Sequence, residues 1–220
     1  MKLKNNERLD DLQINDLFII QSGDEYSFTS DAVALANFVH VSNYGRVVDL
    51  CSGSGVIGIL VNAKNKVKDV TLVEIQENLA DMSARTIEYN GVDNISVVND
   101  KLQGVHKTIG EGQFDVVVCN PPYRKLSHDQ KINEKENIAI ARHEIKVTLE
   151  EIIFEASKLL KFGGHFYLCH QEDRLTDIMV LLRKYSLEPK ELKVIDNSKG
   201  NIILLKAKKG GKSGIKISLK

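Results

Sequence analysis

Short runs of β-branched and other apolar residues alternate along this chain with longer amphipathic segments. The short runs predict seven strands: Arg46–Leu50, Val70–Ile75, Ile95–Asn99, Phe114–Asn120, His165–His170, Leu192–Asp196 and Ile202–Ala207. Between them, apolar residues recur at helical spacing, as in Val56–Ala63 and Glu77–Tyr89. This alternation is typical of parallel strands joined by crossover helices.

The expected helix ends carry their own signals. Gly91 follows the second helix and suits a left-handed C-terminal cap. Thr148 and Glu151 have the spacing of a capping box, which predicts a helix running to Leu160. A further helix is expected from Asp173 to about Tyr185.

The last two predicted strands are separated only by Asn197–Gly200, so the final strand should return antiparallel as a hairpin. The expected fold is α/β: a Rossmann-like, seven-stranded and mostly parallel sheet with helices on both faces, an arrangement that resembles that of class I methyltransferases. Ahead of it, Asp10–His40 predicts a small unit with a hairpin-like stretch at Leu17–Ile20 and a helix from about Ser30. We divide the chain into an N-terminal extension (1–43), a methyltransferase domain (44–208) and a basic C-terminal tail (209–220).

Length and composition favour one main domain. A chain of 220 residues with 42% hydrophobic content can bury one sizeable core. The sequence has neither an apolar run of about 18 residues nor a leader-like start, so we expect a cytoplasmic protein that does not enter a membrane. Cys51, Cys119 and Cys169 are widely spaced, which favours free thiols over a zinc site or a disulfide framework. We expect no metal and a monomer.

Charge is balanced overall but uneven along the chain. The 30 basic and 30 acidic residues cancel, which argues against a globally basic nucleic-acid coat. After Asp196, however, the charged side chains are all lysines: Lys199, Lys206, Lys208, Lys209, Lys212, Lys216 and Lys220. Two interpretations stay open, a solvated and frayed C-terminus or a weak phosphate-attracting arm.

The turn after the first predicted strand carries the pattern of a cofactor site. Gly53, Gly55 and Gly58 spell G-x-G-x-x-G between a strand and a helix, and Glu74 follows about 20 residues later, so a nicotinamide fingerprint is formally matched. Asp49 argues against it, because an acid beside the loop would oppose a pyrophosphate. S-adenosylmethionine has a cationic amino acid end and no phosphate, so we favour that cofactor and keep a nicotinamide oxidoreductase as the alternative.

The residues of this turn, and those at the ends of the next two predicted strands, have expected roles in binding the cofactor. Gly53 and Gly55 let the backbone approach the methionyl part closely, and Glu74 accepts hydrogen bonds from the two ribose hydroxyls. Asp100 either accepts from the adenine amino group or is only a strand-end cap. The predicted cofactor residues of the core are Asp49, Ser52, Gly53, Ser54, Gly55, Glu74, Ile75, Asp100, Lys101, Leu102 and Asn120.

The most informative motif is the tetrad Asn120-Pro121-Pro122-Tyr123, whose four residues are the predicted catalytic residues. The adenine amino group is a poor nucleophile because its lone pair is delocalised into the ring. The Asn120 side-chain oxygen and the Pro121 carbonyl would accept its two protons and aim the lone pair at a methyl group, while the prolines hold both acceptors in direction. Tyr123 would stack on the base, worth roughly 1 to 3 kcal/mol. Such a transfer relies on positioning and needs no metal.

The span from Leu17 to about Lys208 resembles the amino-methyltransferases marked by this tetrad. Within them it is most similar to the bacterial family that methylates the adenine amino group next to the anticodon of valine tRNA. The segments that carry the resemblance are Tyr26–Val33, Asp49–Gly55, Asn120–Tyr123 and Ala141–Glu144.

The resemblance implies further site residues. Phe28, Thr29 and Asp31 would help to cover the cofactor, and Arg142 and His143 would lie near the substrate. Cys51 is a departure, because many class I enzymes have glycine there, and the assignment requires its side chain to point away from the cofactor. Independently, the long polar connection from Tyr123 to Val147 is rich in phosphate-seeking groups, so Arg124 and Lys125 join the predicted RNA-binding residues.

The expected function is therefore methylation of an adenine amino group in tRNA, where a loop base is already partly unstacked. An alternative is methylation of a glutamine side chain in a release factor or another protein, since a carboxamide is also a planar conjugated amine. Such enzymes usually have a larger helical N-terminal domain than the about 45 residues ahead of Arg46. DNA adenine methylation is less favoured because a target-recognition domain is lacking.

Overall fold

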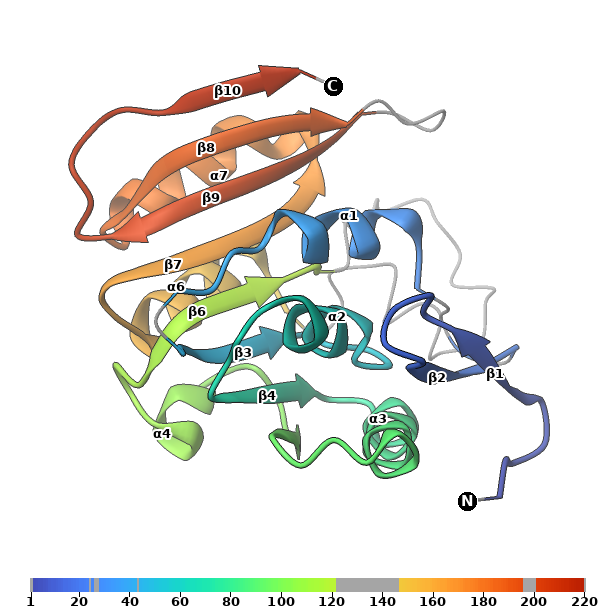
Figure 1. Ribbon diagram of the computed structural model, residues 1–220. Coiled ribbons are helices and arrows are strands. Elements are labelled where there is room, and N and C mark those ends of the chain that lie inside the picture. The colour runs from blue at the N-terminus through green and yellow to red at the C-terminus, as the bar shows by residue number, and fades with distance from the viewer. Residues whose placement is uncertain are drawn as a thin grey trace, which may run out of the picture.

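The computed structural model describes residues 2–23, 25, 28–42, 44–121, 147–195 and 201–219. Its middle layer is a sheet with the strand order β10-β8-β9-β7-β6-β3-β4-β5 (Figure 1). The strands of this sheet are β3 (Arg46–Leu50), β4 (Asp69–Glu74), β5 (Ile95–Asn99), β6 (Phe114–Cys119), β7 (Leu160–Gln171), β8 (Leu187–Ile195), β9 (Ile202–Lys209) and β10 (Lys216–Leu219). The helices are α1 (Ser30–Phe38), α2 (Val56–Lys64), α3 (Glu77–Asn90), α4 (Val105–Ile109), α6 (Leu149–Leu159) and α7 (Leu175–Lys184), with a 3₁₀ turn η1 at Glu172–Arg174.

The sheet has the predicted α/β architecture. Strands β5, β4, β3, β6 and β7 pair in parallel, and β9 runs antiparallel between β7 and β8. All seven predicted strands are therefore present, and the antiparallel final strand of the expected hairpin is confirmed. The turn of that hairpin, at 196–200, lies outside the described residues.

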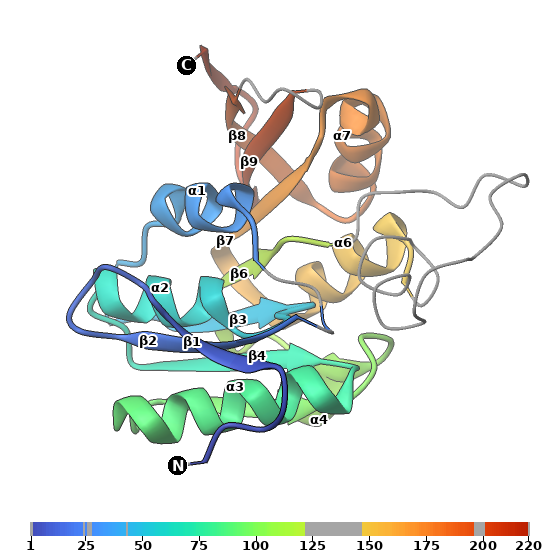
Figure 2. The same cartoon turned by 90° about the vertical axis from the view of Figure 1, so that its right-hand side faces the viewer.

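Helices cover both faces of the sheet, as the sequence predicts (Figure 2). Helices α1, α2 and α3 lie on one face, and α4, α6 and α7 lie on the other. Residues of β3 alternate between the two cores: Val47 packs on the α1–α2 side, whereas Val48 and Leu50 pack on the α6–α7 side. Because both faces are buried, the strands are almost continuously apolar. Each helix in the described part of the chain is too short or too polar to cross a membrane.

The local signals at two helix ends are confirmed. Helix α3 ends at Gly91, whose φ of 62° is left-handed. At the start of α6, the Thr148 side chain accepts a hydrogen bond from the Glu151 backbone nitrogen, and the Glu151 side chain accepts one from the Thr148 nitrogen. These reciprocal bonds satisfy amides that a helix start otherwise leaves without a partner.

Several elements differ from the sequence prediction. Strand β8 begins at Leu187 instead of Leu192. Strand β7 begins at Leu160 instead of His165: Leu160 already pairs with Phe114 of β6, and a register shift separates this pair from the pair Val116–His165. Helix α4 was not predicted, because five residues are too few for a periodic pattern. Part of the predicted tail is also corrected: Lys216–Leu219 forms an eighth strand, β10, parallel to β8, and is not a frayed end.

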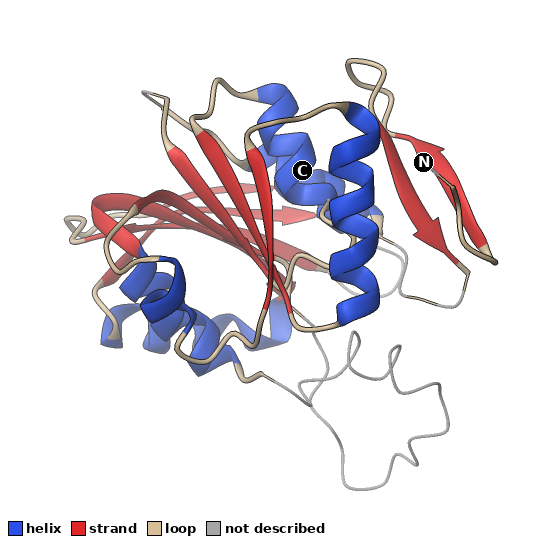
Figure 3. Cartoon of the chain, turned by 90° about the horizontal axis from the view of Figure 1, so that it is seen from below, coloured by secondary structure: helices blue, strands red, loops and turns tan. Residues whose placement is uncertain are grey.

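The N-terminal residues form a hairpin of β1 (Glu7–Asp11) and β2 (Phe18–Ser22) that is separate from the central sheet. Figure 3 shows it beside α3. The backbone nitrogens of Phe18 and Ile20 donate to the side chains of Asn90 and Thr86, so the free edge of β2 is covered by a polar stripe of α3. The predicted strand-like stretch at Leu17–Ile20 and the helix from Ser30 are confirmed, whereas β1 was missed because its sequence is mostly polar.

Candidate functional site

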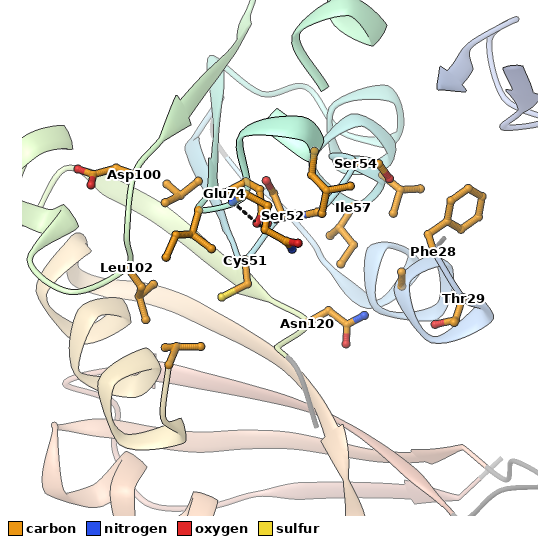
Figure 4. Close-up of a pocket in the computed structure, with 18 residues that line it drawn as sticks. Phe28, Thr29, Cys51, Ser52, Ser54, Ile57, Glu74, Asp100, Leu102 and Asn120 are labelled. Carbon is orange, nitrogen blue, oxygen red and sulfur yellow. Dashed lines mark hydrogen bonds between the residues drawn. The ribbon is translucent and has the colours of Figure 1, made fainter. Parts of the chain in front are cut away.

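A cavity of about 940 Å³, including its open mouth, lies at the carboxyl ends of β3, β4, β5 and β6 (Figure 4). The chain passes from β3 to β4 and β5 on one side and then returns to place β6 on the other side of β3. In doubly wound sheets, ligands bind where the strand order reverses in this way. The cavity is lined by Phe28, Thr29, Ala32, Cys51, Ser52, Gly53, Ser54, Val56, Ile57, Val73, Glu74, Ile75, Gln76, Leu79, Asp100, Leu102, Asn120 and Val147.

The glycine loop between β3 and α2 forms one wall. Gly53 has a left-handed φ of 56°, and a Cβ added there would meet nothing within 4 Å, so a ligand can approach the backbone closely at this point. Gly55 is packed instead: its φ is 84°, and an added Cβ would come within 2.8 Å of Leu72 Cδ1. The loop is further held by the Ser83 hydroxyl, which donates to the Gly53 carbonyl.

Glu74, at the end of β4, forms the floor of the cavity. Its Oε2 accepts from the Gly53 nitrogen at 2.8 Å, and its Oε1 accepts from the Gln76 nitrogen at 2.9 Å (Figure 4). Burial raises the pKa of the Glu74 carboxyl, and the hydrogen bonds from these two backbone amides oppose that shift. The two amides therefore fix the Glu74 carboxylate in one orientation. Each of its oxygens can still accept a further hydrogen bond from a ligand.

Asp49 lies beneath the loop and does not line the cavity. Its Oδ2 accepts from the Gly58 nitrogen in the first turn of α2 at 2.9 Å, whereas its Oδ1 is buried without a partner among the described residues. Complete burial raises the pKa of Asp49 to about 8, the Gly58 amide lowers it, and the neighbouring Glu74 charge raises it further. The acid predicted to favour a cationic ligand thus supports the loop from below.

The end of β5 supplies the opposite side of the cavity. Leu102 is buried and lines it, and Asp100 lines it at the rim. The Asp100 carboxylate accepts from the Lys101 nitrogen at 2.7 Å and is turned away from Glu74 in Figure 4. The strand-end cap is therefore its observed contact, and an adenine contact stays a prediction. Lys101 itself is exposed and outside the lining.

Asn120 follows β6 and lines the same cavity as Gly53 and Glu74. In Figure 4 its side chain lies between Cys51 and Thr29. Pro121 is buried beside it. The remaining predicted catalytic and RNA-binding residues lie outside the described residues: Pro122, Tyr123, Arg124, Lys125, Arg142 and His143.

The structure brings most predicted cofactor residues to one cavity. Those that line it are Phe28, Thr29, Ser52, Gly53, Ser54, Glu74, Ile75, Asp100, Leu102 and Asn120, and those that do not are Asp31, Asp49, Gly55 and Lys101. The expectation for Cys51 was wrong: instead of pointing away, it has a left-handed φ of 56° and lines the cavity near Leu102.

Sequence reasoning missed the apolar part of the lining. The missed residues other than Cys51 are Ala32, Val56, Ile57, Val73, Gln76, Leu79 and Val147. Several of them could have been found from their positions, because Val73 and Gln76 flank the Glu74–Ile75 pair and Val56 opens the helix after the glycine loop. Val147 carries no such signal.

The charge of the lining selects the kind of ligand. The described lining residues include two carboxylates, Glu74 and Asp100, and no lysine or arginine. A phosphate-bearing dinucleotide would meet only negative charge here, whereas a ligand with a cationic end and two ribose hydroxyls fits. Two buried polar atoms of the lining, Ser52 Oγ and Gln76 Oε1, have no partner in the described part of the chain and are further places for a polar ligand to bind.

Among the described residues, no group of three or more His, Cys, Asp or Glu side chains could hold a metal ion. The expected free thiols are confirmed for all three cysteines. Burial and the Cys51 thiol raise the pKa of Cys119 well above its usual range, so that thiol stays protonated.

Comparison with known proteins identifies the class. Residues 30–185 match the family described as methyltransferase small domain, and this match covers well over half of the chain. The chain therefore belongs to that family. It is a methyltransferase whose cofactor is S-adenosylmethionine, and its α/β fold is Rossmann-like.

The sequence identity to individual relatives is low. The tRNA1(Val) (adenine(37)-N6)-methyltransferase of Pseudoalteromonas translucida (strain TAC 125) is 29% identical over 141 residues, which cover 64% of this chain and 58% of that protein. The enzyme of the same name from Shewanella sp. (strain W3-18-1) is 24% identical over 181 residues, covering 80% of this chain and 74% of that enzyme. Among solved structures, Atu636 from Agrobacterium tumefaciens, described as a predicted O-methyltransferase, aligns with a TM-score of 0.67 at 22% identity over 86% of this chain and 85% of that one.

Proposed function

We propose that this methyltransferase modifies the exocyclic amino group of an adenine in tRNA, at the position next to the anticodon of valine tRNA. The observation that carries the proposal is the position of Asn120, the first residue of the Asn-Pro-Pro-Tyr tetrad, on the wall of the acid-lined cavity. The names of the relatives from Pseudoalteromonas and Shewanella support the same substrate.

The proposed chemistry depends on two oxygen acceptors. S-adenosylmethionine supplies an electrophilic methyl group on a sulfonium sulfur. The Asn120 side-chain oxygen and the Pro121 carbonyl would accept hydrogen bonds from the two N–H groups of the amino group, so that its lone pair becomes available and positive charge on the nitrogen is stabilised. As the bond from the methyl carbon to nitrogen forms, its bond to sulfur breaks, S-adenosylhomocysteine leaves, and the methylated nitrogen loses one proton to water. The prolines restrict the backbone and keep the acceptors aligned. Tyr123 stacks on the base, and Arg124, Lys125, Arg142 and His143 contact the RNA.

The cofactor residues have complementary roles in this proposal. Glu74 accepts from the ribose hydroxyls, and Gly53 allows the methionyl part to approach the loop. Phe28 and Thr29 cover the cavity from the start of α1, while Ile75 and Leu102 enclose the adenine ring of the cofactor. A tRNA substrate also implies a cytoplasmic enzyme, and we propose that it acts as a monomer without a metal.

The substrate is tested with labelled S-adenosylmethionine. We expect label in bulk tRNA, and in a valine tRNA transcript but not in the same transcript with guanine in place of the adenine next to the anticodon. Release factor protein and duplex DNA serve as parallel acceptors. Label only in the protein would refute the RNA substrate in favour of a glutamine side chain, and label only in DNA would refute it equally.

The role of Asn120 is tested by its replacement with alanine. We expect Asn120→Ala to lower turnover by about 100-fold or more, which is typical for the loss of one group that stabilises the transition state. Its affinity for S-adenosylhomocysteine should stay nearly unchanged. Glu74→Ala should show the reverse pattern, with weak cofactor binding. Asn62→Ala, an amide of α2 outside the cavity lining, is the matched control. A large loss of cofactor affinity in Asn120→Ala would mean that its role is cofactor binding.

A further inference from the structure

The N-terminal hairpin is attached to the methyltransferase core at fixed points. Asn90 Oδ1 accepts from the Phe18 nitrogen at 2.9 Å, and Asn90 Nδ2 donates to the Phe18 carbonyl at 2.7 Å. Two residues later, the Ile20 nitrogen donates to Thr86 Oγ1 at 3.1 Å. These bonds fix the position of β2 against α3, and the strand period then decides where the next side chain points.

That next residue is Gln21, which is 1% exposed. It shares a face of β2 with Ile19, whose side chain packs into the core beside α1 and α2. Its Nε2 donates to Ser54 Oγ at 2.8 Å and to the Ile20 carbonyl at 3.1 Å. Its Oε1 accepts from the Phe28 backbone nitrogen at 3.1 Å.

The two outer partners of Gln21 belong to two adjoining walls of the cavity. Ser54 is in the glycine loop, Phe28 precedes α1, and the two residues lie next to each other in Figure 4. No hydrogen bond between these two walls other than the bridge through Gln21 is seen in the described residues. A primary amide is suited to this position because it donates and accepts at the same time.

We propose that Gln21 is a positioning residue for the cofactor, which sets the spacing between the glycine loop and the Phe28 cover. The inference rests on the proposed function for the bound cofactor, S-adenosylmethionine, and is independent of the methyl acceptor. The hairpin is then part of the cofactor site, although neither β1 nor β2 contributes a residue to the described lining. Loss of the bridge would leave both walls in place but free to move apart.

The test uses Gln21→Met in the full-length protein, because methionine keeps the buried volume and removes all three hydrogen bonds. We expect the Kd for S-adenosylhomocysteine, measured by calorimetry, to rise about tenfold, equal to ~1.4 kcal/mol. In methyl transfer assays, KM for the cofactor should rise while kcat at saturation stays within twofold. The Phe28 amide should also exchange its hydrogen faster, since its acceptor is gone.

The matched control is Asn65→Leu. Asn65 Oδ1 accepts from the Val41 nitrogen and its Nδ2 donates to the Val61 carbonyl, so this change also removes side-chain hydrogen bonds, but at the far end of α2. We expect a lower Tm and a Kd within twofold of wild type. An equal rise of Kd in Asn65→Leu and Gln21→Met would overturn the proposal, because the effect would then follow stability alone. An unchanged Kd in Gln21→Met would overturn it as well.

A second variant covers the case in which Gln21→Met does not fold. Gln21→Asn keeps the primary amide but is one methylene shorter, so it cannot bond Ser54 and Phe28 at the same time. We expect a Kd about threefold above wild type. A Kd equal to wild type would contradict the bridge. Both experiments measure cofactor binding. Their outcome therefore does not depend on whether tRNA, protein or DNA is the methyl acceptor.

Discussion

At the scale of single residues, the site is built around buried carboxyl groups. Asp49 is the penultimate residue of β3 and Glu74 is the last residue of the adjacent β4, and each accepts a hydrogen bond from a backbone amide of the glycine loop or the helix after it. Burial raises the pKa of both groups. Their carboxyls hold the loop in shape, and their negative charge favours a cationic ligand over a phosphate.

The raised pKa of Asp49, about 8, leads to a pH prediction. An acid with a raised pKa binds its proton more tightly in the folded state, so its stabilising effect is complete below about pH 4 and is lost as the pH rises through about 8. We expect the contribution of Asp49 to the free energy of unfolding of the cofactor-free protein to fall with rising pH by at most about 1.4 kcal/mol per pH unit in this range. Urea unfolding between pH 5 and pH 9 measures it.

Asp49→Asn is the matched variant for this prediction. Its side-chain oxygen can still accept from the Gly58 nitrogen, but it has no carboxyl proton to lose. We expect its stability to depend less on pH between 5 and 8 than that of wild type, while Glu74 contributes equally to both. A wild-type slope that persists unchanged in Asp49→Asn would assign the titration to another group.

At the scale of elements, the Leu102 side of the cavity depends on a contact between α6 and the turn before α4. Glu155 is 3% exposed, and its Oε1 accepts from the Gly104 nitrogen at 2.7 Å. Its Oε2 accepts from the His106 nitrogen and lies 2.7 Å from His106 Nδ1. This contact anchors the turn that carries Leu102 into the cavity, so α6 supports the site without lining it.

We therefore expect Glu155→Leu to destabilise the fold by about 3 kcal/mol, because it leaves a buried imidazole and two buried amides without their acceptor. The Kd for S-adenosylhomocysteine should rise severalfold as the Leu102 wall loses its support. Urea unfolding and calorimetry check the two effects. Glu150→Leu, on the same helix but bonded to exposed Lys184 and Tyr185, should change neither by much. Equal effects in both variants would refute the anchoring role.

At the scale of the whole molecule, the cofactor cavity and the C-terminal strand lie in different parts of the sheet. The cavity is at β3, β4, β5 and β6, whereas β10 is the outermost strand at the opposite edge. Besides its pairing with β8, the C-terminal segment is held by Lys190, whose Nζ donates to the carbonyls of Lys212 and Gly214. We therefore expect β10 to stabilise this edge of the sheet and to leave cofactor binding unchanged.

We predict that deletion of residues 212–220 lowers Tm by about 4 °C, the shift expected for a loss of ~1 kcal/mol in a chain of this size. The Kd for S-adenosylhomocysteine should stay within twofold of wild type. Thermal unfolding and calorimetry provide the two readouts. An unchanged Tm would mean that β10 does not stabilise the sheet, and a weaker cofactor affinity would contradict the separation of the two regions. The same deletion tests the phosphate-attracting interpretation of the lysines if tRNA affinity is measured at two salt concentrations.

Local patterns explain which parts of the fold were predictable. The strands β3 to β6 and the capping box of α6 depend on residues close in sequence, and their spacing was sufficient. Strand β10 was missed because four residues next to glycines and lysines give no strand signal until β8 offers an edge. For the site, the glycine loop and Glu74 were predicted from motif spacing. The prediction for the Cys51 side chain was wrong, since no motif reveals the left-handed backbone of this residue.

The sequence alone determined the order of the elements, the class of the fold and the identity of the chemical groups at the carboxyl ends of the strands, because periodicity and motif spacing act over short distances. The tertiary structure decided which of those groups reach the cavity. It buried Asp49 under the loop, turned Asp100 toward its own backbone and brought Gln21 to Ser54 and Phe28. The contact of Gln21 with Ser54 joins segments that are far apart in sequence, and the contact of Asp49 with Gly58 depends on the packing of β3 on α2, so only the folded chain could define them.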